Sequence, residues 1–196
     1  MSTGVYLAMV KPPPPSRPRS AEQTRAEILR AARHAFATRG YAQSGVREIA
    51  ADAGITAALI VRYFGSKKDL FLTVLAAEMH VTGFFEAGRE RFGEHVIEYL
   101  TRKPTRDDDT LSILLLGAGD EEIRADVTRV FQEQITKPLA EWLGGPDAEA
   151  RAALILSVIS GLWMYRVLLP LDPLTASMTP ATKTRLATML QALVDT

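Results

Sequence analysis

The side chains of this chain that could carry chemistry form no recognisable catalytic group. The sequence has no glycine-rich phosphate loop, no HExxH or Gly-x-Ser-x-Gly motif and no cysteine, and its three histidines are scattered. Three consecutive aspartates at 107–109 invite a metal site, but adjacent carboxylates cannot all face one ion without a special turn, so we expect a solvent-exposed helix start instead. We therefore predict a binding protein rather than an enzyme, with no metal and no cofactor.

Residues 44–71 carry the clearest functional pattern. Apolar side chains recur with helical spacing over about 45–53, and Gly54 can take the positive φ that ends a helix. Thr56 can then accept the first N–H groups of a second helix over about 57–64. Two helices joined by a three-residue turn that contains glycine are typical of the helix-turn-helix motif.

Serines stand where this motif needs helix caps, and apolar residues stand where its helices must dock. Ser44 precedes the first helix, and Ser66 follows Gly65, so we predict that Ser44 and Ser66 each cap a helix. Ile60 and Phe64 share the face that can dock on the first helix. The other side chains of the second helix remain available to a partner, and they are Ala57, Ala58, Val61, Arg62 and Tyr63.

The motif resembles the DNA-binding signature of the TetR family of bacterial transcriptional repressors. The resemblance rests on the segments VREIAADAGIT and VRYFGSKKDLF and covers about residues 23–75. It implies that Arg47 reads bases and that Tyr63 and Lys67 contact phosphates. It also implies a homodimer that binds a palindromic operator of double-stranded DNA and responds to a small-molecule effector. The DNA-contact candidates are Arg47, Thr56, Ala57, Ala58, Val61, Arg62, Tyr63 and Lys67.

The second helix is more apolar than the usual family pattern. The pair at 57–58 is Ala-Ala where family members often have a polar pair, and Leu59 and Val61 stand where Thr and Tyr are common. These changes leave base recognition to Arg47, to Arg62 and to apolar contact with thymine methyl groups. They also keep an alternative function open, a helical dimer that binds a small molecule or a partner protein and has weakened or lost DNA binding.

Charge is distributed unevenly although the net charge is zero. Residues 1–70 carry eleven Lys and Arg against five Asp and Glu, a net +6, whereas residues 71–196 carry twelve against eighteen, a net −6. This asymmetry is typical of a basic DNA-binding head on an acidic body. Four consecutive prolines within residues 1–19 predict an extended, disordered arm, which either is solvated or reaches the minor groove of DNA.

A helix is predicted from Lys67 toward Met79, as a continuous rod that links the head to the body. Three glycines then predict a break within 82–93. Aromatic residues of the body either line a ligand cavity or belong to an ordinary core. The cavity candidates are Phe84, Phe85, Phe92, Tyr99, Phe131 and Trp142.

The last third of the chain predicts helices that need a partner. A long helix is expected over 120–143, where Pro138 can kink it, and another over about 147–165. Small residues recur every fourth position on that second helix, and the last helix, from Thr179, carries an apolar stripe. We predict that these two helices form a four-helix dimer interface, with packing inside one chain as the alternative. The interface candidates are Ala153, Ser157, Gly161, Leu186, Leu190 and Leu193.

Together these patterns predict an all-α protein in three parts. They are a disordered Pro-rich arm at 1–19, a helix-turn-helix DNA-binding domain at 20–66, and a helical ligand-binding and dimerisation domain at 67–196. The first twenty residues lack a signal peptide and the uncharged run at 152–165 is too short for a typical membrane span, so we expect a cytoplasmic protein without a membrane partner. The predicted function is a ligand-responsive, homodimeric DNA-binding regulator, most simply a repressor.

Overall fold

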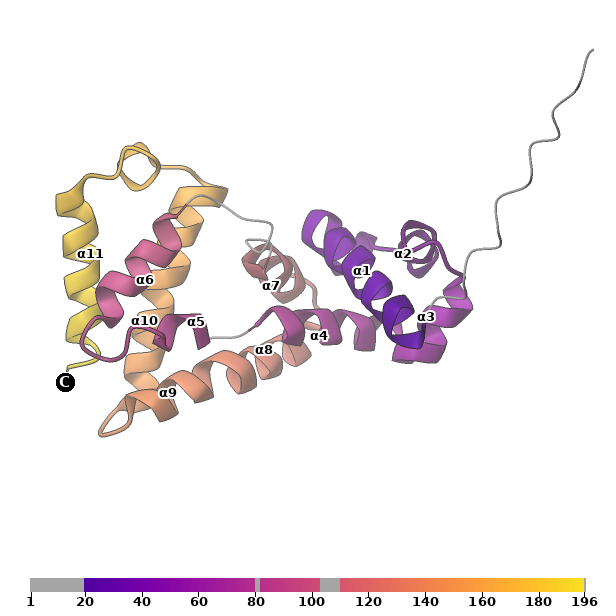
Figure 1. Cartoon of the computed structure of the whole chain (residues 1–196), viewed down its shortest axis with the longest axis horizontal. Helices are drawn as coiled ribbons and strands as arrows, with labels where there is room; N and C mark the ends of the chain where they lie inside the picture. The colour runs from indigo at the N-terminus through magenta and orange to yellow at the C-terminus, as the bar shows by residue number, and fades with distance from the viewer. Residues whose placement is uncertain (1–19, 80–81, 103–109, 196) are drawn as a thin grey trace, which may run out of the picture.

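The computed structural model describes residues 20–79, 82–102 and 110–195, and these residues form helices and turns without a β-strand. The all-α prediction is confirmed. The molecule is elongated, with α1, α2 and α3 at one end, α6, α10 and α11 at the other, and α7 between them (Figure 1). The predicted arm at 1–19 and the aspartates at 107–109 lie outside the described residues.

Four helices build the head end. A capping box starts the first of them: the Ser20 hydroxyl accepts a hydrogen bond from the Gln23 N–H at 3.1 Å, and the Ser20 N–H donates to the Gln23 side chain at 3.0 Å. Gly40 takes a φ of 74°, a left-handed conformation that suits glycine and turns the last residues of that helix. The four helices are α1 (Ala21–Gln43), α2 (Val46–Asp52), α3 (Ala57–Phe64) and α4 (Lys67–Glu78).

The linking helix α4 has the predicted extent. Its start is the expected one, because the Ser66 hydroxyl accepts a hydrogen bond from the Asp69 N–H at 3.0 Å. At Met79 the backbone becomes extended, with φ −88° and ψ 97°, and the Met79 side chain is buried. The next helix, α5, spans only Thr82–Phe85. The helix predicted from Lys67 toward Met79 is therefore confirmed, but it ends before the range 82–93 in which the break was expected.

The body contains a bent helical run that follows the prediction for 120–143 in part. Its pieces are α8 (Arg124–Phe131), a π-helical segment (Gln132–Thr136) and α9 (Lys137–Leu143). The π-helical segment ends two residues before Pro138. Proline lacks an N–H and its ring crowds the preceding turn, so a locally wider turn accommodates it.

Three further helices complete the body around that run. They are α6 (Phe92–Thr101), α7 (Thr110–Ala118) and α10 (Ala148–Trp163), and α10 continues as a π-helical segment over Met164–Leu168. After a 3-10 turn at Asp172–Leu174, the chain ends in α11 (Pro180–Ala192). The Thr179 hydroxyl caps α11, as it accepts a hydrogen bond from the Thr182 N–H at 3.2 Å.

The run Ala148–Leu168 is long and apolar enough to cross a membrane by length and composition, and 33% of its most apolar window is buried in the fold. Arg151 is buried at its start and donates hydrogen bonds to the carbonyl groups of Gly144 and Leu193. At its other end, Arg166 donates to the carbonyl of Leu174 at 2.7 Å. Both flanking arginines therefore bind the protein's own backbone.

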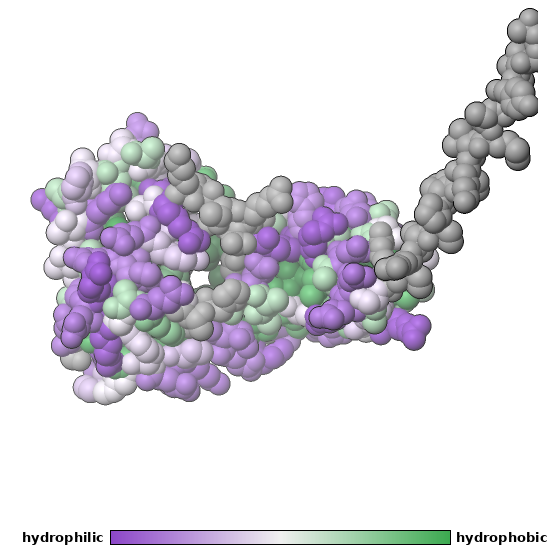
Figure 2. All heavy atoms as spheres, viewed as in Figure 1, coloured by the Kyte–Doolittle hydropathy of each residue, from purple (hydrophilic) through white to green (hydrophobic). Residues whose placement is uncertain are grey.

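Two buried cores lie along the molecule. The head core joins α1–α4 to α7 and α8, and its centre is an edge-to-face pair of Phe36 and Phe71 with ring centroids 4.9 Å apart. Gly117 of α7 fits against Phe71 so closely that an added Cβ would lie 2.6 Å from the ring. The body core joins α6, α9, α10 and α11. Figure 2 shows apolar side chains at the surface between the two ends. Leu115 and Leu116 of α7 are exposed apolar side chains.

Candidate DNA interface and effector cavity

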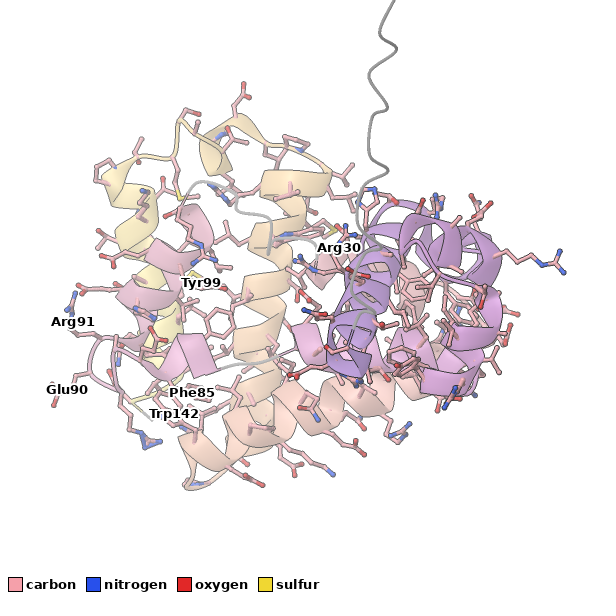
Figure 3. The ribbon with its side chains drawn as sticks, turned by 45° about the vertical axis from the view of Figure 1, so that its right-hand side comes forward. Arg30, Phe85, Glu90, Arg91, Tyr99 and Trp142 are labelled. Carbon is pink, nitrogen blue, oxygen red and sulfur yellow. The ribbon has the colours of Figure 1, made fainter. Side chains whose placement is uncertain are left out.

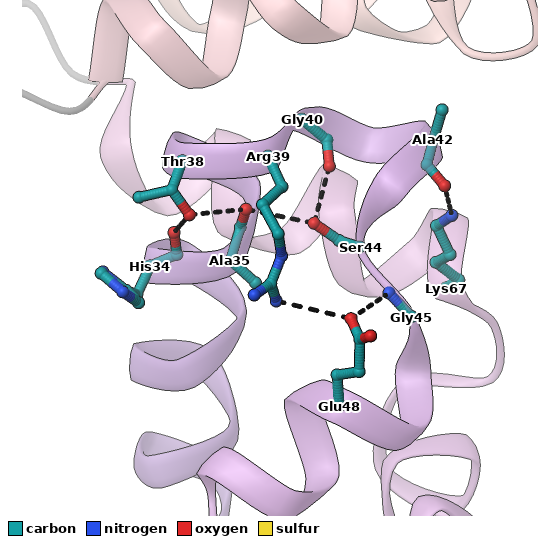
Figure 4. Close-up of polar contacts among 10 residues, drawn as sticks. All are labelled: His34, Ala35, Thr38, Arg39, Gly40, Ala42, Ser44, Gly45, Glu48 and Lys67. Atoms are coloured by element: carbon teal, nitrogen blue, oxygen red, sulfur yellow. Dashed lines mark hydrogen bonds and ion pairs between the residues drawn. The ribbon is translucent and has the colours of Figure 1, made fainter.

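The start of α2 is built differently from the prediction. Ser44 does not cap α2, because its hydroxyl is fully buried and donates hydrogen bonds to the carbonyl groups of Gly40 at 2.7 Å and Ala35 at 3.1 Å (Figure 4). The Glu48 carboxylate instead accepts a hydrogen bond from the Gly45 N–H at 3.4 Å. Ser44 thus anchors the end of α1, and its buried polar atoms are satisfied by backbone carbonyls.

The turn between α2 and α3 has the expected glycine in a left-handed conformation, with φ 67° at Gly54. The Ile55 N–H donates back to the Ala50 carbonyl at 2.9 Å, which closes α2. Thr56 occupies the cap position of α3, but its side chain accepts no hydrogen bond from the helix. The hydroxyl of Thr56 and the first N–H groups of α3 therefore remain available to an outside acceptor.

Helix α3 has one buried face and one uncovered face. Ile60 is fully buried in the head core, whereas Ala58, Val61 and Arg62 are exposed, Val61 to 53%. Tyr63 is half-buried against the head core, so its ring is held in place while part of it stays accessible. The exposed face of α3 is therefore apolar, with Arg62 as its cation.

The basic side chains of the head differ in how far they are already engaged. Arg33 of α1 pairs with Glu78 at the end of α4 at 2.9 Å, inside the head, whereas Lys68 of α4 pairs with Asp126 of α8 at 2.9 Å and so joins the head to a later helix. Arg47, on α2, is exposed, and in the described part of the molecule it forms neither an ion pair nor a side-chain hydrogen bond. The same holds for Arg62, so these two cations are available to a polyanion.

Lys67 is held at the start of α4. Its ammonium group donates a hydrogen bond to the Ala42 carbonyl at 3.3 Å and lies 4.2 Å from the centre of the Tyr41 ring. The Tyr41 hydroxyl in turn donates to Glu122 at 3.2 Å. Burial and the neighbouring Glu122 carboxylate raise the pKa of Tyr41 to about 12. Lys67 is thus prepositioned on the surface and linked to the body through Tyr41.

The predicted aromatic residues of the body separate into two groups. Phe84, Tyr99 and Phe131 line a cavity of about 140 Å³ together with Trp163, which the sequence analysis missed. Trp163 lies on one face of α10 with Leu156, Ile159 and Ser160, and this spacing of three and four residues was a signal that could have found it.

The other three aromatic residues do not line this cavity. Phe85 stacks on Trp142 with ring centroids 4.8 Å apart, and Phe92 is fully buried 5.2 Å from Trp142. Figure 3 shows Phe85 and Trp142 together, away from Tyr99. The prediction of one cavity lined by all six is therefore wrong for Phe85, Phe92 and Trp142, because these rings pack on one another in the body core.

The predicted dimer-interface residues are also divided. Ala153 and Ser157 of α10 are exposed, and a Cβ added at Gly161 would meet nothing within 4 Å. Leu186 and Leu193 of α11 are half-buried. Leu190 is fully buried against the rest of the body core, so it is not available to a partner chain and is removed from the predicted interface. Apolar side chains that the prediction omitted are exposed on the same two helices, namely Leu154 at 53% and Met189 at 55%.

Family comparisons match this architecture over most of the chain. A family profile described as bacterial regulatory proteins of the tetR family matches residues 28–74, which include α2 and α3. A second profile, described as a tetracyclin repressor-like C-terminal domain, matches residues 90–194. A search of curated proteins gave no match.

Solved structures with this fold come from several bacteria. A TetR-family regulator from Streptomyces coelicolor A3 is 29% identical, covers 92% of this chain and 99% of its own, and superposes with a TM-score of 0.58. The GusR protein of Salmonella enterica is 19% identical over 91% of this chain and 98% of its own, with a TM-score of 0.69. A transcriptional regulator from Aquifex aeolicus is 21% identical over 87% and 99%, with a TM-score of 0.64. With both profiles matched, the chain belongs to the TetR family of transcriptional regulators, which are DNA-binding proteins and not enzymes.

Proposed function

We propose that this protein is a homodimeric repressor whose two heads bind the half-sites of a palindromic operator and whose body binds a small-molecule effector. The observation that carries the proposal is the uncovered face of α3, beside which Arg47 and Arg62 are exposed, two cations that have no partner among the described residues. A recognition helix must present its outer face to the major groove, and that face of α3 is free.

Arg47 and Arg62 supply the polar part of base recognition in this proposal. An arginine can bond the O6 and N7 atoms of guanine at the same time, which distinguishes that base from the other three. Val61 supplies the apolar part, because its exposed methyl groups suit contact with a thymine methyl. The operator is therefore expected to contain a guanine and a thymine in each half-site at the positions these side chains reach.

Phosphate contacts would fix the head on the duplex. The uncapped start of α3, with the free hydroxyl of Thr56, presents N–H groups and the positive end of a helix dipole. Tyr63 and Lys67 add a hydroxyl and an ammonium group on the same short segment of chain, and Lys67 is already oriented by its bond to the Ala42 carbonyl. These groups carry no sequence information but determine how the recognition helix is placed.

The apolar surface of α10 and α11 supports the dimer. Ala153, Ser157 and Gly161 leave a face of small side chains open to a second helix, and Leu154 and Met189 stand exposed on these two helices. Exposed apolar side chains gathered on one part of a soluble protein mark an interaction site. A second copy of the chain, related by two-fold symmetry, would match the symmetry of a palindromic operator.

The apolar character of α3 supports one second candidate, a helical dimer with weakened or lost DNA binding. Ala57, Ala58, Leu59 and Val61 offer no hydrogen bond to a base edge. The two candidates differ in their response to salt, because phosphate contacts release counterions and make affinity fall steeply as salt rises. A cytoplasmic location follows from the first candidate, since a bacterial operator lies there.

The test is selection of bound fragments of genomic DNA by the purified protein, followed by affinity measurements on the selected site at several salt concentrations. Enrichment of a palindromic site, with log affinity falling linearly against log salt, is the expected result. Retention of random DNA alone, or no retention at low salt, would contradict the repressor proposal and favour the second candidate.

A further inference from the structure

The effector cavity has an electrostatic character that its residues define. It lies where the end of α4 meets α5, α6, α7, the first π-helical segment and α10, and at about 140 Å³ it is smaller than a typical drug-binding pocket. Its walls are mainly aliphatic, with aromatic rings from four residues. The aromatic residues are Phe84, Tyr99, Phe131 and Trp163.

Glu78 is the one ionised side chain among the described residues that line this cavity. It is the last residue of α4, and its side chain is 23% exposed. The face of an aromatic ring carries negative charge density, so a ring face and the Glu78 carboxylate are both groups that attract positive charge. A purely neutral ligand would leave the carboxylate without a direct partner from the ligand.

The structure already contains two cations near these groups. Arg33 of α1 pairs with the Glu78 carboxylate at 2.9 Å, and the Arg102 guanidinium lies 3.8 Å from the centre of the Tyr99 ring. Neither arginine is among the residues that line the cavity. Tyr99 extends from α6 toward α10 (Figure 3). Both the carboxylate and one ring of the cavity are thus seen to engage positive charge.

We propose that the cavity binds a small organic cation with an apolar body, whose positive charge competes with Arg33 for the Glu78 carboxylate. A regulatory role for this cation rests on the proposed function as a repressor. The apolar part would fill the space between Phe131, Trp163 and the aliphatic walls, and the charged part would lie between Glu78 and the ring faces, where cation–π attraction is strongest when water is excluded.

The Arg33–Glu78 ion pair gives this ligand a route to the DNA-binding head. Arg33 stands on α1, which packs against α2, α4 and α7, and Glu78 stands at the point where α4 ends. A cation that takes over Glu78 removes the ion pair that holds the last turn of α4 to α1. Because α3 packs against α4 and α2 packs against α1, a shift between α1 and α4 changes the position of the recognition helix, so operator affinity falls, and by linkage operator DNA weakens binding of the cation by the same factor.

The direct test compares trimethylphenylammonium with its uncharged isostere tert-butylbenzene, using the full-length protein and isothermal titration calorimetry. We expect the cation to bind roughly tenfold more tightly, because both the Glu78 carboxylate and the ring faces attract its charge. Glu78→Gln should reduce this preference to the part that the rings supply, while leaving tert-butylbenzene binding unchanged. Glu86→Gln, at an exposed carboxylate outside the cavity lining, is the matched control and should keep the preference.

A second variant makes a prediction of opposite sign. Arg33→Met keeps the apolar stem of the side chain but removes the internal competitor, so the cation should bind roughly two- to fivefold more tightly than to the wild type. Thermal unfolding of each variant shows whether it is folded before binding is measured. Equal binding of the two compounds to the wild type, or a Glu78→Gln protein whose preference for the cation is undiminished, would overturn the ligand class.

Operator affinity is measured on the same protein with and without trimethylphenylammonium, which separates the two proposals. A fall of roughly 5- to 150-fold supports the regulatory route. Operator binding that the bound cation leaves unchanged would overturn that route without affecting the DNA-binding proposal. Absence of any operator binding, with a cation preference that depends on Glu78, would overturn the repressor function and leave the ligand class standing.

Discussion

The two ends of this molecule hold their helices together in different ways. At the head end, polar groups fix the geometry: the buried Ser44 hydroxyl bonds to two carbonyl groups of α1, and exposed serine caps fix the starts of α1 and α4. At the body end, α10 and α11 keep a large apolar surface uncovered, including Leu154, Met189 and a stretch over 167–169. The helices of the head are held by contacts within the chain, including those to α7 and α8, whereas the body presents a surface that another chain would cover.

This difference follows from what each end would bind. DNA is polar and rigid, so a reading head needs few exposed apolar groups but an exact placement of α3; Val61 is the large apolar side chain of α3 that stands exposed. A second copy of the chain is apolar in the same places, so the body can leave Leu154 and Met189 in solvent until it pairs. Between the ends, Gly117 packs against Phe71 and so joins α7 to the head core.

The largest expected effect is on stability, at Gly93, where α6 crosses α11 inside the body. An added Cβ at Gly93 would overlap the carbonyl oxygen of Ala187 in α11 and lie 3.0 Å from the Gln191 nitrogen, and backbone atoms cannot move aside as a flexible side chain can. Gly93→Ala should therefore destabilise the protein by about 3 kcal/mol or more, because overpacking separates α6 from α11. Urea unfolding measures the change.

Gly88→Ala is the control for that variant, as it carries the same chemical change where nothing lies within 4 Å, although its positive φ of 71° adds a backbone cost of about 1 kcal/mol. A Gly93→Ala protein no less stable than Gly88→Ala would show that α6 and α11 do not cross as closely as described. The contrast between the close α6–α11 contact inside the body and the uncovered face of α10 would then not hold.

The next effect concerns Gly161, on the uncovered face of α10. In a single chain a Leu side chain at this position would extend into open space, so the free energy of unfolding of the monomer should change little. In a dimer the same side chain would hold the partner helix away, and we expect dimerisation to weaken by about 2–3 kcal/mol. Sedimentation equilibrium measures the dimer, and urea unfolding at low protein concentration measures the monomer. Normal dimerisation of Gly161→Leu would place the interface elsewhere, and a wild type that sediments as a monomer would contradict the proposed dimer.

A smaller effect is expected at the head, where two substitutions should distinguish base recognition from phosphate contacts. Arg47→Ala should lose about 1–3 kcal/mol on the operator and relax the preference at one base pair of each half-site, because a bidentate contact to guanine is removed. Lys67→Ala should weaken cognate and random DNA alike and reduce the salt slope by about one. Fluorescence anisotropy on both DNAs at several salt concentrations gives these values. An equal loss on cognate and random DNA for Arg47→Ala would remove it from base reading.

Local signals explain why the head was predictable from sequence. Gly54, Ser66 and the helical spacing of apolar residues act within a few positions, so the helices of the motif and the cap of α4 follow from the residues themselves. Ser44 was the exception. Its hydroxyl bonds to carbonyls four and nine residues back, at Gly40 and Ala35, and the bond to Ala35 depends on how α1 turns at Gly40.

The body was less predictable because its outcome depends on packing between distant segments. Phe84 and Phe85 are adjacent in sequence, yet one lines the cavity and the other stacks on Trp142. Leu186 and Leu190 belong to one apolar stripe, yet Leu190 alone is fully buried in the chain. The stripe predicts that a helix needs apolar neighbours, but only the position of α6 determines which of its residues the same chain covers.

The smallest effect tests the joint between the two ends, at Tyr41. Tyr41 belongs to α1, and its hydroxyl donates to Glu122, which precedes α8. Tyr41→Phe should lower the free energy of unfolding by about 0.5–1.5 kcal/mol at pH 7, the usual net value of one hydrogen bond.

This contribution of Tyr41 to stability should depend on pH. The folded-state pKa of Tyr41, about 12, lies above the ordinary value of 10.0, so the contribution is complete below pH 10 and is lost as the pH rises from 10 through 12. Deprotonation would place a phenolate beside the Glu122 carboxylate and separate the head from the body. Urea unfolding of the wild type and of Tyr41→Phe at pH 8, 10 and 11 measures the difference, and the comparison cancels the titration of the other tyrosines. If the two proteins lose stability in parallel over this range, the Tyr41–Glu122 contact does not hold the two ends together.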